Sequence, residues 1–407
     1  TAFLGFEVNE GEYKVMGMAP YGSPKYVDKV WSVVRQNDDS SFWLDPDYFS
    51  IYYSTRRAYT RKFLDLFGDP RNPETPFFTQ TTGYPFYYGE RPRNFDEMCR
   101  YNQHYADVAA SIQVVTEELM INLAREVQSR TGSTRLCLAG GVALNSVANG
   151  RILRETAFEE LYIQPSAGDG GAALGAALFA WHCALGNPRR FVMDHAYWGQ
   201  SYDSDEMRPP IDNSGLKPLY VEDDSKLLEM TVDRMTAGKV IGWFQGRFEW
   251  GPRALGNRSI LAAPRQAEMK DVVNAKIKFR EPFRPFAPAV LAEETERYFD
   301  IQDVDQQMPA RFMLLVVPVL DHQKDAISAV NHLGTSRIQT VYQDVSPMYY
   351  QLIQKFSEAT GVPVLLNTSF NVRGEPIVSS PQDALNTFAN SGIDTLVMGN
   401  FLLDKPD

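Results

Sequence analysis

Residues 161–172, LYIQPSAGDGGA, pass from a short apolar strand into a glycine-rich turn, and then into an alanine-rich helix that we expect to end near Leu185. The same order occurs upstream in residues 136–145, LCLAGGVALN, where the turn is Gly140-Gly141 and a helix starts near Asn145. Strands, glycine turns and helices in this order indicate α/β units. This part of the chain therefore predicts an α/β fold.

The segments before this stretch are less regular. Residues 1–40 begin with a strand-like run, and a turn-rich segment follows at 16–22. Residues 42–105 hold 18 of the 50 aromatic residues without a helix or strand period, and we interpret them as an aromatic-rich insertion. Apolar residues at spacings of three and four from Val108 to Leu123 then predict an amphipathic helix that stops at Gly132.

The segments after it divide into a linker and a second domain. Asn187-Pro188, Pro209-Pro210 and Asn213-Ser214-Gly215 are typical of loops, so we place a linker at 186–215 and domains at 1–185 and 216–407. The second domain is also predicted to be α/β, with strands at 240–244, 286–291, 312–320, 362–366 and 395–398. Ser-Pro pairs at 346–347 and 380–381 predict two helix starts.

The composition narrows the class of protein. With 44% hydrophobic residues the chain has enough apolar side chains to form a hydrophobic core, and its net charge is -11. Nucleic acid and anionic membranes repel an acidic chain, so we expect neither as a partner. Three widely spaced cysteines, no apolar run that could span a bilayer and no signal peptide favour a cytoplasmic protein with reduced thiols.

One window reverses the charge of the chain. Residues 247–284 carry nine cations against four acids, a net charge of +5, whereas the rest of the chain carries -16. Arginine and lysine among Gly and Pro suit the binding of several phosphates, although a solvated basic surface would have the same composition. The cations are Arg247, Arg253, Arg258, Arg265, Lys270, Lys276, Lys278, Arg280 and Arg284.

Two further groups of residues suit the binding of a polar ligand. Backbone N–H groups of the two glycine turns can hold phosphate, while Asp169 suits either a helix N-cap or a ligand to metal or phosphate. Gly168–Ala173 fits a dinucleotide pattern only weakly, because no acid stands at the expected distance beyond it. Residues 335–337, TSR, and 367–374, NTSFNVRG, place hydroxyl, amide and guanidinium groups beside an apolar strand.

Six segments in order resemble the O-carbamoyltransferases of nodulation-factor and antibiotic biosynthesis. They are 12–22 EYKVMGMAPYG, 138–145 LAGGVALN, 168–172 GDGGA, 249–259 EWGPRALGNRS, 283–288 FRPFAP and 366–371 LNTSFN. The resemblance runs the whole length of the chain and implies a partial actin-like domain, followed by a YrdC-like domain with an open twisted α/β sheet.

The resemblance also implies a reaction and its residues. The YrdC-like domain makes carbamoyl adenylate from carbamoyl phosphate and ATP, with Mg²⁺, and the actin-like domain transfers the carbamoyl group to an acceptor hydroxyl. Lys278, Arg337 and Ser369 are the implied catalytic residues. The implied substrate- and ATP-binding residues are Arg253, Arg258, Arg280, Arg284, Asn371, Gly140, Gly141 and Asn145.

This sequence departs from the family in two places. Asp169 matches one ligand of a divalent metal, typically iron, whose His ligands lie in an N-terminal family segment upstream of the position that Thr1 occupies. We therefore expect a fragment that holds no tightly bound iron and cannot complete transfer. The family usually reads Asp-Gly-Thr where this chain has Leu333-Gly334-Thr335, which puts a role for that carboxylate in doubt.

The expected acceptor is a sugar-containing molecule, such as a nodulation factor or an aminoglycoside-like metabolite, and a homodimer is the candidate assembly. Rings of the aromatic insertion either line the acceptor cleft by stacking on sugar faces or simply pack a core. They are Trp43, Tyr52, Tyr53, Tyr84, Tyr87 and Tyr88. The alternative functions are a threonylcarbamoyl-type tRNA-modifying enzyme and a non-catalytic scaffold with the same fold.

Overall fold

The computed structural model describes residues 1–405, which divide into two compact units. Unit 1 comprises residues 1–134, 147–159 and 280–285. Unit 2 comprises 135–146, 160–279 and the described residues from 286 onward. The domain limits at 185 and 216 remain predictions, because these units group residues by packing rather than by chain order.

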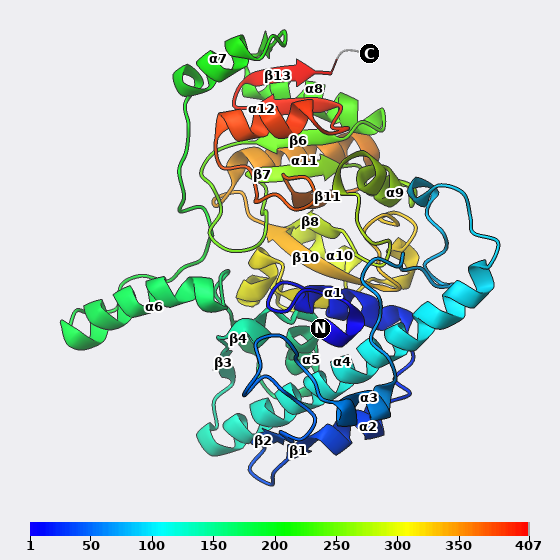
Figure 1. Ribbon diagram of the computed structural model, residues 1–407. Coiled ribbons are helices and arrows are strands. Elements are labelled where there is room, and N and C mark those ends of the chain that lie inside the picture. Colours follow the sequence, from blue (N-terminus) through cyan, green and yellow to red (C-terminus); the bar gives the residue numbers. More distant parts are fainter. Residues whose placement is uncertain (406–407) are drawn as a thin grey trace. The chain divides into compact units, whose positions relative to one another are not determined.

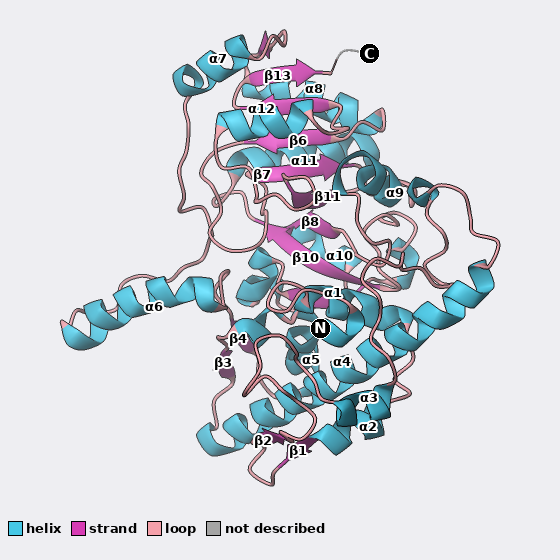
Figure 2. Ribbon diagram, viewed as in Figure 1, coloured by secondary structure: helices cyan, strands magenta, loops and turns pink. Residues whose placement is uncertain are grey.

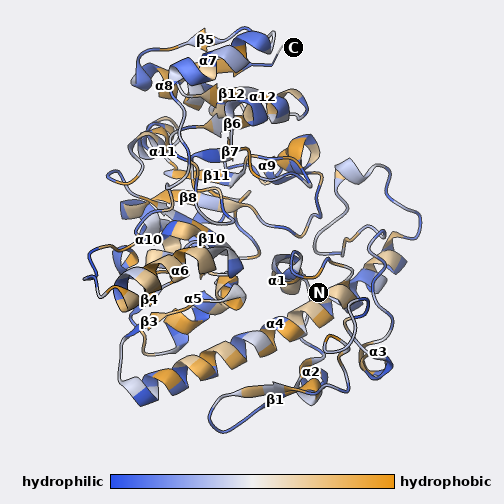
Figure 3. Ribbon diagram, turned by 60° about the vertical axis from the view of Figure 1, so that its left-hand side comes forward, coloured by the Kyte–Doolittle hydropathy of each residue, from blue (hydrophilic) through white to orange (hydrophobic). Residues whose placement is uncertain are grey.

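Unit 1 is built around one long helix, α4 (Phe95–Thr131). Hydrophobic and hydrophilic residues alternate along α4 (Figure 3), and its buried side packs on apolar residues such as Met18, Phe77 and Phe283. The helix ends where Gly132 adopts a left-handed φ of 65°, as the sequence predicts. The other elements of unit 1 are α1 (Glu12–Met18), α2 (Val27–Val33), β1 (Val34–Gln36), β2 (Phe42–Leu44) and α3 (Arg61–Phe67).

Two predictions for unit 1 are wrong. The opening run is not a strand but a single 3-10 turn, Ala2–Leu4, whose Phe3 and Leu4 are buried. The segment 16–22, predicted as turns, contains the last residues of helix α1 and the 3-10 turn Ala19–Tyr21. Short apolar runs do not distinguish a strand from a helical turn, and packing on α4 decides here.

The aromatic insertion is partly core and partly surface. Phe78 stacks on Phe95 at 5.3 Å between ring centres, and Tyr84 and Tyr88 pack against this pair. Tyr52 and Tyr53, in contrast, are exposed to 62% and 74%. Part of the aromatic insertion therefore packs in a core, as one of the two alternatives expected. A role of the insertion in an acceptor cleft stays a prediction.

Unit 2 contains a nine-stranded mixed sheet (Figures 1 and 2), whose strand order is β5-β13-β12-β6-β7-β11-β8-β10-β9. Its centre is apolar, since every residue of β6, β7, β8 and β12 is buried. The strands are β5 (Leu219–Tyr220), β6 (Ile241–Phe244), β7 (Arg258–Ala262), β8 (Ala287–Leu291), β9 (Leu315–Pro318), β10 (Thr335–Val341), β11 (Val364–Ser369), β12 (Thr395–Met398) and β13 (Phe401–Asp404).

Helices cover both faces of this sheet. Helices α8 and α11 pack against each other on one face, and α12 packs on the other together with α7 (Figures 1 and 2). The predicted starts of α11 and α12 are confirmed. The helices of unit 2 are α7 (Ser204–Asn213), α8 (Asp224–Thr236), α9 (Met269–Val273), α10 (Thr295–Tyr298), α11 (Pro347–Thr360) and α12 (Pro381–Ala389), and a π-helical turn, Asn274–Lys278, follows α9.

Two expectations for unit 2 need correction. Pro209 and Pro210 lie inside helix α7 rather than in a loop, because Asp203 and Glu206 form a capping box that stabilises the start of this helix. The predicted strand at 312–320 is shorter, since Phe312 ends a 3-10 turn and only Leu315–Pro318 pairs with a neighbouring strand.

The α/β units predicted from the glycine turns are also present. Strands β3 (Arg135–Cys137) and β4 (Glu160–Tyr162) pair in parallel, and helices α5 (Ser146–Glu155) and α6 (Ala172–Phe179) follow the two turns. The π-helical turn Ala180–Ala184 extends α6, and none of the residues of α6 or this turn is buried. None of the helices within residues 1–405 is both long and apolar enough to cross a membrane.

Candidate functional site

Lys278 lies at the carboxyl end of β11, where it meets two other predicted site residues. Its Nζ lies 2.7 Å from Asn371 Oδ1 and 3.2 Å from Ser369 Oγ. The backbone oxygens of Ser369 and Asn371 lie 2.6 and 2.9 Å from the same nitrogen. An ammonium group has only three N–H donors for these four oxygens, so the four contacts compete. Lys278 is only 5% exposed, so few water molecules can hydrate its ammonium group.

The chain around Lys278 is fixed on both sides. Lys276 forms an ion pair with Asp394 at 2.7 Å, and its carbonyl oxygen accepts a hydrogen bond from the N–H of Gly392. After Lys278, the left-handed φ of 44° at Phe279 ends the π-helical turn. Ser369 and Asn371 also contact each other, at 2.7 Å between Ser369 Oγ and Asn371 Oδ1. These contacts order the three side chains before any ligand arrives.

Arg337 shares one face of the large sheet with residues of β11. Strand β8 lies between β10 and β11, and it pairs Ala289 with Gln339 and Ala287 with Asn367. Continuing the parallel register by two residues places Arg337 level with Ala287 and therefore with Asn367. Residues that are level across a sheet point to the same face, and the two strands lie about 10 Å apart. Ser369 is two residues beyond Asn367 and points the same way.

One polar residue of this face, Gln339, was missed by the sequence analysis, whereas Asn367 lies in the segment 367–374 that it singled out. Gln339 lies two residues beyond Arg337 in β10, and its Nε2 donates to the carbonyl oxygen of Leu255 at 2.6 Å. The Asn367 Nδ2 donates to Gln339 Oε1 at 2.8 Å. Residues two positions apart in a strand point to the same face, so Gln339 could have been grouped with Arg337. The sequence analysis did not predict strand β10, and this signal was therefore not used.

Arg258, another of the predicted ligand-binding residues, is held by backbone carbonyl groups. Its side chain is fully buried at the start of β7, and its two terminal nitrogens donate to the carbonyl oxygens of Gln245, Gly246, Asn257 and Gln200. The guanidinium carbon also lies 3.7 Å from the centre of the Phe244 ring. Burial lowers the pKa of Arg258 to about 10. These contacts support the surrounding backbone, and a role of Arg258 with a ligand stays a prediction.

Arg280 and Arg284 belong to unit 1, although Lys278 belongs to unit 2. Arg280 donates to the carbonyl oxygen of Pro285 at 3.2 Å, and burial together with the charge of Arg284 lowers its pKa to about 9. The Arg284 guanidinium lies 4.9 Å from the centre of the Tyr13 ring and 3.6 Å from a Glu281 oxygen. The role of both residues with phosphate stays a prediction.

The two glycine turns lie side by side at the carboxyl ends of β3 and β4. The N–H of Gly140 donates to the carbonyl oxygen of Ala167 at 2.8 Å, and a Cβ built on Gly168 would lie 3.7 Å from Gly141 Cα. Asn145 follows in the next turn and is half-buried. Because the Gly140 N–H is already bonded, Gly141 is the glycine of this pair whose exposed backbone can face a phosphate.

Asp169 does not lie in a metal site that the described residues complete. It is exposed and begins the 3-10 turn Asp169–Gly171, while Gly168 and Gly171 hold the N-cap positions of this turn and of α6. Across residues 1–405, no three His, Cys, Asp or Glu side chains gather as a metal ion would require. The residues present therefore do not fit a resident iron ion.

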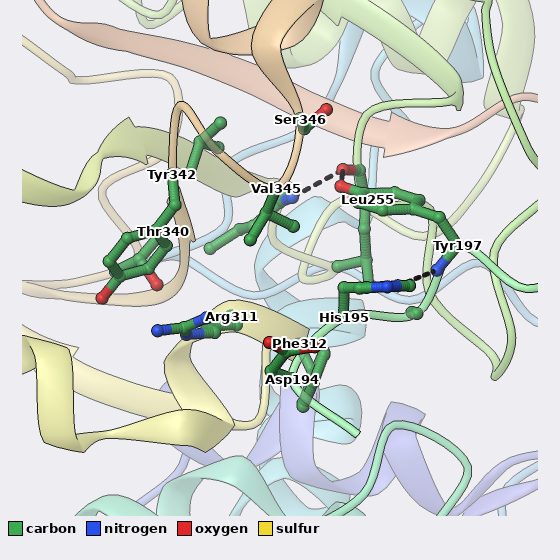
Figure 4. A pocket seen from close by; sticks show the side chains of 13 residues that line it. Asp194, His195, Tyr197, Leu255, Arg311, Phe312, Thr340, Tyr342, Val345 and Ser346 are labelled. Carbon is green, nitrogen blue, oxygen red and sulfur yellow. Dashed lines mark hydrogen bonds between the residues drawn. The ribbon is translucent and has the colours of Figure 1, made fainter. Parts of the chain in front are cut away.

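A small pocket is lined in part by Leu255 of the Arg253 loop, which is residues 249–258 (Figure 4). The Tyr197 hydroxyl donates to the carbonyl oxygen of Leu255 at 2.7 Å, and burial raises the pKa of Tyr197. On the opposite wall, the Arg311 guanidinium stacks on Tyr342 at 4.0 Å from its ring centre. Burial raises the pKa of Tyr342 to about 12. No local pattern in the sequence indicated these residues.

Comparison with known proteins identifies the family. Residues 1–178 match the model described as "Carbamoyltransferase N-terminus", and residues 232–405 match "Carbamoyltransferase C-terminus". Over 97% of this chain, 39% of residues are identical to Nodulation protein NolO of Bradyrhizobium diazoefficiens, of which 66% is covered. An uncharacterized Synechocystis protein is 42% identical over 100% of this chain and 66% of its own length.

A third relative carries a chemical name. The 3'-hydroxymethylcephem-O-carbamoyltransferase of Amycolatopsis lactamdurans is 32% identical over 72% of this chain and 53% of its own length. The chain thus spans about half to two thirds of the length of these curated relatives. The two family models and these relatives agree with one another, and the chain therefore belongs to the carbamoyltransferase family.

Proposed function

We propose that this chain belongs to an O-carbamoyltransferase in which unit 2 makes carbamoyl adenylate from carbamoyl phosphate and ATP. The observation that carries this proposal is the contact of Lys278 with Ser369 and Asn371 at one end of the large sheet, on the face that Arg337 shares. We further propose that the first domain is actin-like and the second YrdC-like, as the sequence resemblance implies.

The residues of this site suit two phosphate-bearing substrates. Lys278 carries more oxygen neighbours than it has donors, so a phosphate oxygen can replace a neutral one at little cost. Arg337, on β10 two strands away from β11, supplies a planar group that can bind two phosphate oxygens at once. The strands that carry Arg337 and Ser369 lie about 10 Å apart, a separation that suits two anionic groups better than one. The hydroxyl of Ser369 is then available to orient the reacting oxygen.

The balanced reaction consumes one water molecule. Carbamoyl phosphate and water give carbamate and phosphate. The carbamate oxygen then attacks the α-phosphorus of ATP, which forms the bond to the adenylate and releases pyrophosphate. Positioning and neutralisation of charge are the main demands of such a transfer, and Mg²⁺ bound to the ATP phosphates would share the second task.

The acceptor is proposed by analogy with the relatives. One relative is named for a hydroxymethyl group as its acceptor, and another is named as a nodulation protein. Both names are consistent with a hydroxyl acceptor, and we propose one on a sugar-containing molecule. Transfer to it belongs to the whole protein, because the described residues do not complete the site around Asp169.

Calorimetry of the 407-residue chain with carbamoyl phosphate, and separately with ATP, tests the proposal. We expect Lys278→Met and Arg337→Met each to weaken carbamoyl phosphate binding at least about tenfold, because each removes a charge-assisted contact of about 1.5–3 kcal/mol. Lys217→Met is the matched control, since Lys217 is an exposed cation of unit 2 outside the site. Unchanged affinity in both site variants, with circular dichroism showing intact folds, would refute the assignment.

A further inference from the structure

The Arg253 loop (residues 249–258) is held by a single buried carboxylate. Glu249 is only 4% exposed, and its Oε1 accepts hydrogen bonds from the N–H groups of Leu255, Asn257 and Arg258 at 2.9, 2.8 and 3.1 Å. Within residues 1–405, its Oε2 accepts no hydrogen bond. Hydrogen bonds to a carboxylate are stronger than those to a neutral acceptor, so one residue fixes the last four residues of the loop.

The carbonyl groups of the same loop are bound by side chains of other elements. Tyr197 and Gln339 both donate to the oxygen of Leu255, at 2.7 and 2.6 Å, and Trp243 Nε1 donates to that of Gly256 at 2.8 Å. Asn367 Nδ2 lies 3.3 Å from the oxygen of Ala254. Two of these donors, Gln339 and Asn367, lie on the sheet face of Arg337. The loop and the proposed anion site therefore share their supports.

Close packing leaves this loop little freedom. Gly251 and Gly256 have φ values of 109° and 108°, which other residues rarely adopt. A Cβ on Gly251 would lie 2.8 Å from the carbonyl oxygen of Pro165, and one on Gly256 only 2.2 Å from the Tyr349 ring. The loop thus has one packed conformation, and Arg253 is half-buried in the middle of it.

We infer that Glu249 is a positioning residue, whose carboxylate holds the backbone at residues 255–258 so that Arg253 presents its charge to the substrate phosphates beside Lys278 and Arg337. This inference rests on the proposed function. It assigns Glu249 no contact with substrate and makes its effect on binding depend on Arg253. That dependence separates positioning from a general contribution to stability.

A double-mutant cycle tests this dependence. Glu249→Gln keeps the length of the side chain and one acceptor oxygen but removes the charge. We expect it to weaken carbamoyl phosphate binding to the 407-residue chain about fivefold, because three charge-assisted hydrogen bonds become neutral ones. In the Arg253→Ala background, the same substitution should change the affinity less than about twofold, since the group it positions is gone. Glu358→Gln, an exposed site on α11, is the matched control.

Two results would overturn the inference. One is an equal loss of affinity in both backgrounds, and the other is no loss in Glu249→Gln alone. Absence of binding by the unaltered chain would instead contradict the proposed function.

Hydrogen exchange of the unaltered chain remains decisive even if the Glu249 variant fails to fold. The amides of residues 255 and 257 should exchange as slowly as those of β6 and β7. Exchange as fast as that of the exposed residues 373–376 would overturn the inference.

Discussion

The Arg253 loop and the turn at Gly140 and Gly141 use the same unusual backbone in opposite surroundings. Gly256 and Gly140 have φ values of 108° and 100°. A Cβ on Gly256 would collide with the Tyr349 ring, whereas one on Gly140 would meet nothing within 4 Å among the described residues. A glycine pattern therefore indicates a backbone conformation, but not whether the surroundings are complete. Unit 2 brings Lys278 together with Ser369 and Asn371, whereas the turns beside Asp169 stay open among the described residues.

Substitution of these two glycines should give the largest difference in stability. We expect Gly256→Ala to lower the free energy of unfolding by about 4 kcal/mol, because strain at positive φ adds to overpacking against Tyr349. Gly140→Ala has the strain alone and should cost about 1–2 kcal/mol. Denaturant unfolding of both variants measures the difference. Equal losses would show that the surroundings of the two glycines do not differ as described.

Removal of a buried cation from the Arg253 loop should have the next largest effect. Arg258→Met leaves several buried carbonyl oxygens without their donor and Glu249 without an opposing charge, so we expect a loss of about 3 kcal/mol. Arg265→Met removes an exposed cation from the same charged window and should cost less than about 0.5 kcal/mol. Similar losses in the two variants would argue against a supporting role for Arg258.

The sequence predicted strands well where apolar residues dominate. The strand at 395–398 was predicted with the bounds of β12, and Ser346-Pro347 correctly marked the start of α11. Strand β7 was missed because it begins with Arg258-Ser259, which have the polar character of a loop until a buried setting for Arg258 is known. In the same way, β11 continues through Asn367 to Ser369 beyond its apolar part.

For the candidate site as well, the sequence indicates local motifs but not the contacts between distant residues. Lys278, Ser369 and Asn371 could be named because the family resemblance points to them through short local motifs, and the structure brings them together. Glu249 and Gln339 could not be assigned as supports of one loop, because their hydrogen bonds join residues up to 84 positions apart. Such contacts follow from strand order and register, which residue patterns within a segment do not contain.

A pH-dependent effect of about 1 kcal/mol or less is expected at the edge of the large sheet. Arg234 binds Asp404 of β13 through two contacts of 2.5 and 2.8 Å, and this hydrogen bonding holds the pKa of Asp404 below its ordinary value. A lowered carboxyl pKa adds stability above the unfolded pKa of about 3.9, and this stability disappears as the pH falls through the folded value. Asp404→Asn should therefore be less stable at pH 7 and equal to the unaltered chain near pH 2.

Substitution of Asp169, beside the exposed glycine turns, should have the smallest effect. Because the described residues do not gather enough ligands around Asp169, we expect elemental analysis of the purified 407-residue chain to find far less than one iron per chain. Asp169→Asn should leave that value unchanged. One tightly held iron per chain, lost in Asp169→Asn, would show that other residues complete the site.

The most direct test of the account is ATP–pyrophosphate exchange by the 407-residue chain. If unit 2 alone builds the site for carbamoyl adenylate, exchange should require carbamoyl phosphate. It should fall at least about tenfold in Lys278→Met, which loses a charge-assisted contact with phosphate, and stay unchanged in Asp169→Asn. Exchange that is absent from the unaltered chain, or equally fast in Lys278→Met, would contradict the central claim.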